Sequence, residues 1–146
     1  MSAAPGSASP RPTAAGVDTG GLIAAALAAR TLAHAPYSNF HVGAAIETAD
    51  GRVFTGCNVE SASYGLTICA ERVALFKAIS EGVHQFRRIA IAAESPELTP
   101  PCGACRQVLR DHCENLEVIL CNPRGETKTY QLSELFPHPF HDKMLS

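Results

Sequence analysis

The sequence predicts a three-layer α/β/α fold, in which helices cover both faces of a mixed sheet of about five strands. Two observations lead to this prediction. Short β-rich runs alternate along the chain with longer segments of helix-forming residues. Hydrophobic residues make up 46% of the 146 positions and charged residues 18%, which allows a real core and excludes global disorder. A chain of this length fits one domain.

The first twenty residues differ from the rest, because Ala, Gly, Ser and Pro supply 14 of them. A segment of this composition cannot bury apolar surface. We therefore expect a disordered tail over residues 1–19 and a single folded domain over residues 20–146. The tail lacks the pattern of a secretory signal, and the apolar run 22–29 is too short to span a bilayer. A soluble, cytoplasmic protein is expected.

Charge argues against two classes of partner. Twelve basic and 14 acidic residues give a formal net charge of −2, and the only adjacent basic pair is Arg87-Arg88. Nucleic acids and membrane surfaces are bound through clustered Lys and Arg. We therefore expect neither as a partner. The six cysteines need not form disulfides in a chain without a signal peptide.

The predicted elements begin with a helix over residues 19–35, which is rich in Ala and Leu and is ended by Pro36. Two β-rich runs, 40–48 and 52–58, flank Ala49-Asp50-Gly51, a sequence typical of a hairpin turn.

A second helix is predicted over residues 70–81, with Val73, Phe76 and Ile79 on one face and Gly82 as its stop. Five shorter elements continue the alternation. They are a strand at 88–93, a helix at 103–112 with Val108 and Leu109 facing inward, strands at 116–120 and 127–130, and a helical turn at 132–136.

Two cysteine-containing segments, each at the start of a predicted helix, carry the chemistry. They are Cys69-Ala70-Glu71 and Pro101-Cys102-Gly103-Ala104-Cys105. A Cys-x-x-Cys pair at a helix start can place two sulfurs on one zinc ion, and a helix N-terminus favours thiolate over thiol. With Cys69 as a third ligand, one coordination position stays open, which is typical of a catalytic site. Glu71 would then move protons for a bound water.

Other interpretations of the cysteines stay open. Taken alone, the pair Cys102 and Cys105 fits a redox site as well as a metal site, although redox chemistry leaves Cys69-Ala70-Glu71 unexplained. A structural zinc site would need a fourth ligand at paired spacing, and neither the remaining cysteines nor the six histidines offer one. We expect Cys57, Cys113 and Cys121 to be small buried hydrophobic residues.

The order Cys-x-Glu, then Pro-Cys-x-x-Cys, is the signature of zinc deaminases. Over roughly residues 20–140 the chain resembles the small-subunit, homotetrameric, zinc-dependent cytidine deaminases. The matching segments are 36–45, 56–60, 69–72, 101–107 and 135–140. The chain departs from the family pattern at Pro100, where Ser is common, and at His41, where Pro is frequent.

The resemblance implies a cytidine-deaminase-like catalytic domain with one Zn²⁺ per subunit, held by Cys69, Cys102 and Cys105. Glu71 would be the catalytic proton carrier. The implied reaction is hydrolytic deamination of cytidine and deoxycytidine to uridine and deoxyuridine with release of ammonia, in pyrimidine salvage. The closest rival is a deaminase of the nucleoside-like antibiotic blasticidin S, which should lack the pair Asn58 and Glu60. A non-catalytic zinc or redox module is the rival from another class.

The resemblance also assigns a nucleoside-binding set. Asn58 and Glu60 lie two apart on a predicted strand, so both side chains point to one face and can hold a ribose hydroxyl. Phe40 and Ala70 are implied contacts of the substrate. The alternatives are a solvated strand end for Asn58 and Glu60, and a core position for Phe40.

Further residues are implied around the metal and between subunits. Arg72, three residues after Cys69 on the same helical face, would draw charge from the sulfurs, and Gln107 is assigned beside it. Neighbouring subunits of a homotetramer would contribute Ala62, Tyr64 and Phe140 to composite active sites. The alternatives are a solvated surface arginine at 72 and a frayed terminus at Phe140.

Overall fold

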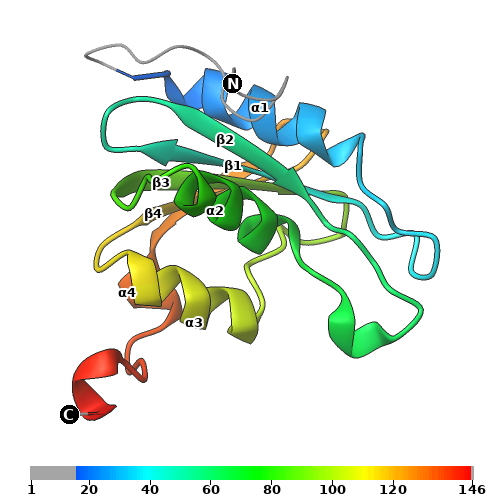
Figure 1. Ribbon diagram of the computed structural model, residues 1–146. Coiled ribbons are helices and arrows are strands. Elements are labelled where there is room, and N and C mark those ends of the chain that lie inside the picture. The colour runs from blue at the N-terminus through cyan, green and yellow to red at the C-terminus, as the bar shows by residue number, and fades with distance from the viewer. Residues whose placement is uncertain (1–15, 146) are drawn as a thin grey trace.

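A computed structural model describes residues 16–145 of the protein (Figure 1). The helices are α1 (Thr19–Arg30), α2 (Ala70–Ser80), α3 (Gly103–His112) and α4 (Leu132–Leu135), with short 3-10 turns η1 (Tyr64–Leu66) and η2 (Asp142–Leu145). The strands are β1 (Val42–Thr48), β2 (Val53–Cys57), β3 (Phe86–Ala93), β4 (Glu117–Cys121) and β5 (Thr127–Gln131). Of the tail predicted over residues 1–19, positions 1–15 lie outside the described residues.

The five strands form one mixed sheet in the order β2-β1-β3-β4-β5, as predicted. Only β3 and β4 are parallel, and the connection between them contains α3. The other pairs are antiparallel, and β1 and β2 form the predicted hairpin. Because β1 is antiparallel to both of its neighbours, the start of β1 lies beside the C-terminal ends of β2 and β3, on the side of the sheet where these strands end.

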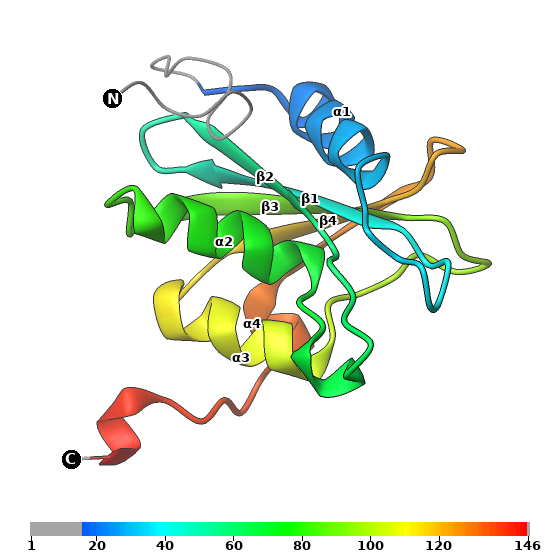
Figure 2. The same cartoon turned by 45° about the vertical axis from the view of Figure 1, so that its right-hand side comes forward.

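Helices cover both faces of the sheet, which confirms the three layers. Helix α1 lies on one face, and α2 and α3 lie on the other (Figures 1 and 2). Each face has its own core cluster, one containing Leu22 of α1 and the other Leu75 and Leu109 of α2 and α3. None of the helices within residues 16–145 is long and apolar enough to cross a membrane.

Two glycines let the helices approach the sheet closely. A Cβ at Gly43 would lie 2.1 Å from the carbonyl oxygen of Ala26 in α1. A Cβ at Gly56 would lie 2.5 Å from the backbone nitrogen of Ala74 in α2. The backbone of α2 is therefore pressed against the end of β2, and this contact fixes the depth of the helix that begins after Cys69.

Two details of the predicted helices are wrong. Helix α1 ends at Arg30 rather than at residue 35, because His34 pairs with Val59 in an isolated parallel bridge. The face of α2 that enters the core is the one carrying Ala70, Glu71, Ala74, Leu75 and Ala78. Phe76, predicted to lie on the helix's apolar face, is 44% exposed. At the close approach to Gly56 the buried residues of α2 are the small Ala70 and Ala74.

A buried ion pair fastens the first described residues to the sheet. Glu47 is fully buried, and its Oε1 lies 2.6 Å from Nε of Arg88 on the neighbouring strand. Its other oxygen accepts a hydrogen bond of 3.0 Å from the backbone N–H of Val17, and Arg88 also donates to the Thr19 hydroxyl at 2.9 Å. The start of α1 is thus held by groups from β1 and β3.

Candidate metal centre and active site

Three cysteines meet where α2 and α3 begin. Cys69 is the N-cap residue of α2, Cys102 is the N-cap residue of α3, and Cys105 is buried in the first turn of α3. Neither N-cap thiol accepts a hydrogen bond from a backbone N–H of its own helix. Because both sulfurs are free of capping contacts, they are available to a metal at the positive ends of two helices.

The spacing of the sulfurs fits a zinc ion. The Sγ atoms of Cys69 and Cys102 are 3.7 Å apart, and all three sulfurs lie within 4.8 Å of one another. In a tetrahedral site with Zn–S bonds of about 2.3 Å, neighbouring sulfurs are about 3.8 Å apart. Three thiolates match the donor preference of zinc and leave one coordination position open. The geometry and the donor set therefore suit zinc.

The surroundings favour negative charge on the sulfurs. Nη2 of Arg72 donates to Sγ of Cys69 at 3.4 Å. The pKa of the Cys69 thiol is lowered to about 5, chiefly by a hydrogen bond with Cys105 and also by those with Arg72 and Cys102. The same contact with Cys69, together with burial, raises the pKa of Cys105. Arg72 is therefore no solvated surface arginine, since it contacts a predicted metal ligand.

Glu71 is a buried acid beside the cysteines. It is 4% exposed, and burial raises the pKa of its carboxyl from 4.5 to about 7, with the negative charge of Cys69 adding to the rise. A carboxyl with a pKa near neutrality can both accept and release a proton at physiological pH. The helix start that supplies Cys69 thus also supplies a group suited to proton transfer.

A pocket of about 270 Å³ opens beside the start of β1 and the C-terminal ends of β2 and β3. It brings together most of the predicted site residues, namely Phe40, Asn58, Glu60, Cys69, Ala70, Glu71 and Cys102. Cys105 is not among the lining residues and is buried behind them. The remaining lining residues are Ser38, Val42, Thr67, Ile91, Thr99 and Pro100, of which sequence reasoning singled out only Pro100.

Asn58 and Glu60 organise the segment that enters β1. The amide of Asn58 donates to the carbonyl oxygen of Phe40 at 2.8 Å and accepts from the N–H of Val42 at 2.9 Å. Oε1 of Glu60 accepts from the N–H groups of Tyr37 and Ser38, at 2.9 and 3.1 Å. Both side chains are therefore held by backbone groups at the pocket wall, which differs from a solvated strand end.

The structure places Gln107 away from its predicted role. Its Nε2 donates to Oδ1 of Asp111 at 3.0 Å and to the carbonyl oxygen of Phe140 at 2.9 Å. These two contacts use both hydrogens of the amide. Its role beside the metal ligands gains no support, and its observed contacts hold the C-terminal segment against α3.

The preceding residue does support the metal centre, and sequence reasoning missed it. Nε of Arg106 donates to the carbonyl oxygen of Pro101 at 2.8 Å, and Nη1 donates to that of Leu135 at 2.5 Å. Arg106 thereby fixes the peptide directly before Cys102. The sequence did offer a signal for this role of Arg106, since Arg106 directly follows Cys105 in the segment 101–107 that matches the family.

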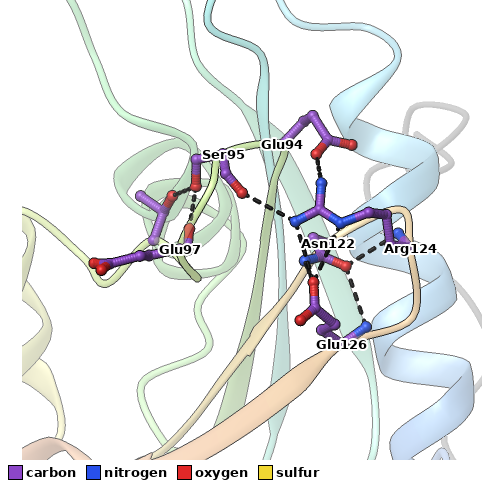
Figure 3. Close-up of polar contacts among 7 residues, drawn as sticks. Glu94, Ser95, Glu97, Asn122, Arg124 and Glu126 are labelled. Atoms are coloured by element: carbon purple, nitrogen blue, oxygen red, sulfur yellow. Dashed lines mark hydrogen bonds and ion pairs between the residues drawn. The ribbon is translucent and has the colours of Figure 1, made fainter.

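The loop between β3 and α3 is held from the other side by Arg124 (Figure 3). The guanidinium of Arg124, in the turn between β4 and β5, donates to Glu94 and, at 3.1 Å, to the carbonyl oxygen of Ser95. The Ser95 hydroxyl in turn lies 2.7 Å from that of Thr99, which lines the pocket. The pocket wall formed by Thr99 and Pro100 is thus connected, through Ser95 and Arg124, to the hairpin of β4 and β5.

The three residues assigned to neighbouring subunits do not line the pocket of their own chain. Ala62 and Tyr64 lie in the exposed segment before Cys69, and Tyr64 is 75% exposed. Phe140 is 52% exposed, in the segment that runs past α3 and projects away from the sheet (Figure 2).

The remaining cysteines stay outside the metal cluster. All six cysteines are free thiols. Burial raises the pKa of Cys113 to about 12 and that of Cys121 to about 11, as expected for inert buried thiols. Cys57 was also predicted to be buried, but at the end of β2 it is half-buried.

Comparisons with known proteins agree with this site. Residues 20–120 match the family model described as the cytidine and deoxycytidylate deaminase zinc-binding region. The chain is 50% identical over 120 residues to a cytidine deaminase of Halalkalibacterium halodurans, covering 82% of this chain and 91% of that protein. It is 42% identical over 131 residues to a cytidine deaminase of Sporosarcina psychrophila, covering 89% and 96%.

A solved structure shows the same fold. The crystal structure of cytidine deaminase from Burkholderia pseudomallei superposes with a TM-score of 0.83 at 50% identity, covering 85% of this chain and 100% of that one. The family match extends over more than half of the chain and includes all three clustered cysteines. The chain therefore belongs to the cytidine and deoxycytidylate deaminase family of zinc-dependent hydrolytic deaminases.

Proposed function

We propose that this protein catalyses the hydrolytic deamination of cytidine and deoxycytidine to uridine and deoxyuridine, with release of ammonia. One observation carries the proposal. Glu71, a buried acid with a pKa near 7, lines the same pocket as two cysteines of the three-thiol cluster. The pocket also contains Asn58 and Glu60, whose polar groups are suited to a sugar.

A zinc ion bound by Cys69, Cys102 and Cys105 would supply Lewis acidity, which makes water acidic enough to lose a proton near neutral pH. Glu71 accepts that proton and delivers it to ring nitrogen N3 of the pyrimidine while the oxygen adds to C4. Glu71 then takes the remaining proton from the oxygen on C4 and passes it to the amino group, so the C4–N bond breaks, ammonia departs and C4 becomes a carbonyl. Burial raises the pKa of the Glu71 carboxyl in the metal-free protein, which favours its uptake of a proton. Arg72 moderates the charge of the thiolates through its hydrogen bond to Cys69.

The apolar walls would hold the base. Phe40, Val42, Ala70 and Ile91 line the pocket, and Asn58 holds the backbone of Phe40 and of Val42 by hydrogen bonds. In this arrangement Phe40 packs against the pyrimidine ring, since it remains 38% exposed at the pocket wall.

Charge favours a nucleoside over a nucleotide. The ionisable carboxyl groups that line the pocket are those of Glu60 and Glu71, and none of the described lining residues is Lys or Arg. A 5′-phosphate would require such partners. Glu60 also distinguishes this pocket from that expected for a blasticidin S deaminase. We therefore assign cytidine and deoxycytidine, rather than deoxycytidylate, as substrates.

We also propose a homotetramer with composite active sites. Support comes from aromatic surface around the pocket mouth, where Tyr64 and Tyr37 lie with ring centroids 6.0 Å apart and are 75% and 51% exposed. A hollow lined by Tyr37, Ser38, Glu60, Tyr64 and Thr67 continues from the pocket. A partner subunit's Phe140 would provide an apolar cover there and exclude water.

The cellular role follows from the same chemistry. We propose a cytoplasmic location, which agrees with six free thiols, and a role in pyrimidine salvage, in which cytidine nucleosides are converted to uridine nucleosides. The catalytic domain would comprise residues 20–146, preceded by residues 16–19, which hydrogen bonds hold to β1 and β3.

One experiment tests the activity directly. The purified protein is analysed for zinc and assayed with cytidine, deoxycytidine, deoxycytidylate and blasticidin S, with Glu71→Gln as the control. We expect one zinc per chain and rapid conversion of the two nucleosides only. A protein that holds zinc but converts none of the four compounds would support a non-catalytic zinc module, and preference for blasticidin S would support the rival deaminase.

A further inference from the structure

The carboxylate of Glu60 keeps one acceptor position free. A carboxylate offers about four acceptor positions, two on each oxygen. Oε1 accepts from the backbone N–H groups of Tyr37 and Ser38, which fills both of its positions. Oε2 accepts from the hydroxyl of Ser38. The remaining position is therefore on Oε2, the oxygen that Ser38 contacts.

The hydrogen bonds of Ser38 have a defined direction. Its Oγ accepts from the N–H of Phe40 at 3.0 Å, and a backbone N–H can only donate. The single hydroxyl hydrogen is thus free to point to Oε2 of Glu60. This hydrogen bond is the main reason why the pKa of Glu60 lies below its usual range, so the carboxylate is ionised and accepts only.

Ser38 and Glu60 face the substrate pocket. Both line it, together with Phe40 and Asn58. The main chain of Glu60 is fixed, because its N–H donates to the carbonyl oxygen of His34 at 2.9 Å. The carboxylate can still rotate about its side-chain bonds. The backbone N–H groups of Tyr37 and Ser38 hold Oε1, and the hydroxyl of Ser38 holds Oε2.

We infer that Ser38 is a positioning residue that orients Oε2 of Glu60 to accept a hydrogen bond from the 2′- or 3′-hydroxyl of the substrate's sugar. The inference rests on the proposed nucleoside deaminase function. Ser38 acts through Glu60, so its contribution depends on whether the substrate has a 2′- or 3′-hydroxyl to donate. A serine that merely held the loop before β1 would affect all substrates equally.

The test compares two substrates that differ only at the sugar, cytidine and 2′,3′-dideoxycytidine. The variants are Ser38→Ala and Ser38→Thr, which retains a hydroxyl. Ser80→Ala is the matched control, because it also loses one hydroxyl, at the far end of α2. For Ser38→Ala we expect kcat/KM on cytidine to fall by about 3- to 10-fold, mainly through KM, as for the loss of one hydrogen bond.

On 2′,3′-dideoxycytidine the fall should be less than about twofold, and Ser38→Thr should restore kcat/KM on cytidine to within about twofold of wild type. In a Glu60→Ala background, Ser38→Ala should cause no further loss on cytidine. Equal losses on both substrates, or full additivity with Glu60→Ala, would overturn the role of Ser38 while leaving the deaminase function in place. A zinc-loaded wild-type protein that does not deaminate cytidine would overturn both.

Discussion

Replacing Glu71 by Gln separates proton transfer from shape, because Gln keeps the size and hydrogen bonding of Glu but carries no proton. Each acid–base transfer contributes about 10²- to 10⁴-fold to an enzymatic rate, and Glu71 is assigned more than one. We expect kcat for cytidine to fall by at least about 10³-fold with zinc content unchanged. The assay is cytidine-to-uridine conversion beside metal analysis. Activity within about tenfold of wild type would refute the role of Glu71.

The same substitution has a second consequence for the metal-free protein. The pKa of Glu71 rises from 4.5 to about 7 through burial. A rise of that size corresponds to about 3 kcal/mol. Because the folded pKa is the higher one, the stability contributed by the protonated carboxyl is complete below pH 4.5 and is lost as pH rises through 7.

The measurement is urea unfolding of both metal-free proteins at pH 5 and pH 8. The free energy of unfolding of wild type should fall, relative to Glu71→Gln, by about 2 to 3 kcal/mol between these values. Parallel pH profiles of the two proteins would show that Glu71 does not titrate in this window, and would contradict the raised pKa of its buried carboxyl in the metal-free protein.

Three further changes test other parts of the molecule. Cys102→Ala should abolish zinc binding and lower the thermal midpoint by about 10 °C, because a ligand at 100 times its Kd stabilises the folded state by about 2.7 kcal/mol. If the variant retained one zinc per chain and an unchanged midpoint, Cys102 would not be a metal ligand. Arg88→Met should cost about 3 to 5 kcal/mol in urea unfolding by leaving buried Glu47 unpaired, whereas the exposed Arg87→Met should cost less than about 1 kcal/mol; similar costs for both would contradict the importance of the buried pair. Deletion from Phe140 onward should raise KM several-fold or more while zinc stays bound, and an unchanged KM, or an active monomer in sedimentation, would exclude composite active sites.

Features that depend on neighbouring residues could be predicted from the sequence. The alternation of helical and β-rich segments was enough for the three layers and the mixed sheet, because each signal lies within a few residues. The spacing of Cys102 and Cys105 at a helix start, together with the segment Cys69-Ala70-Glu71, likewise carried the prediction of a metal site. The pocket does contain Glu71, Asn58 and Glu60, although their roles in substrate binding and catalysis stay predictions.

Periodicity was a weaker guide where packing decides. The apolar face of α2 was assigned from Val73, Phe76 and Ile79. Ile79 does pack against the core, but Phe76 is exposed, and the close approach of the helix to Gly56 buries alanines. The end of α1 was placed at a proline, although pairing of His34 with Val59 ends the helix earlier. Both outcomes depend on a second segment that is distant in the chain.

The sequence by itself determined which residues can carry the chemistry, since thiols, a carboxyl and their spacing along a helix are local properties. Tertiary structure alone decided how these groups are supported. It placed Arg106 on the carbonyl of Pro101, Ser38 on the carboxylate of Glu60, and Gln107 on the C-terminal segment instead of the metal ligands. The physical reason is that a hydrogen bond is fixed to a few tenths of an ångström by the packing of whole elements, and no pattern within one segment contains that information.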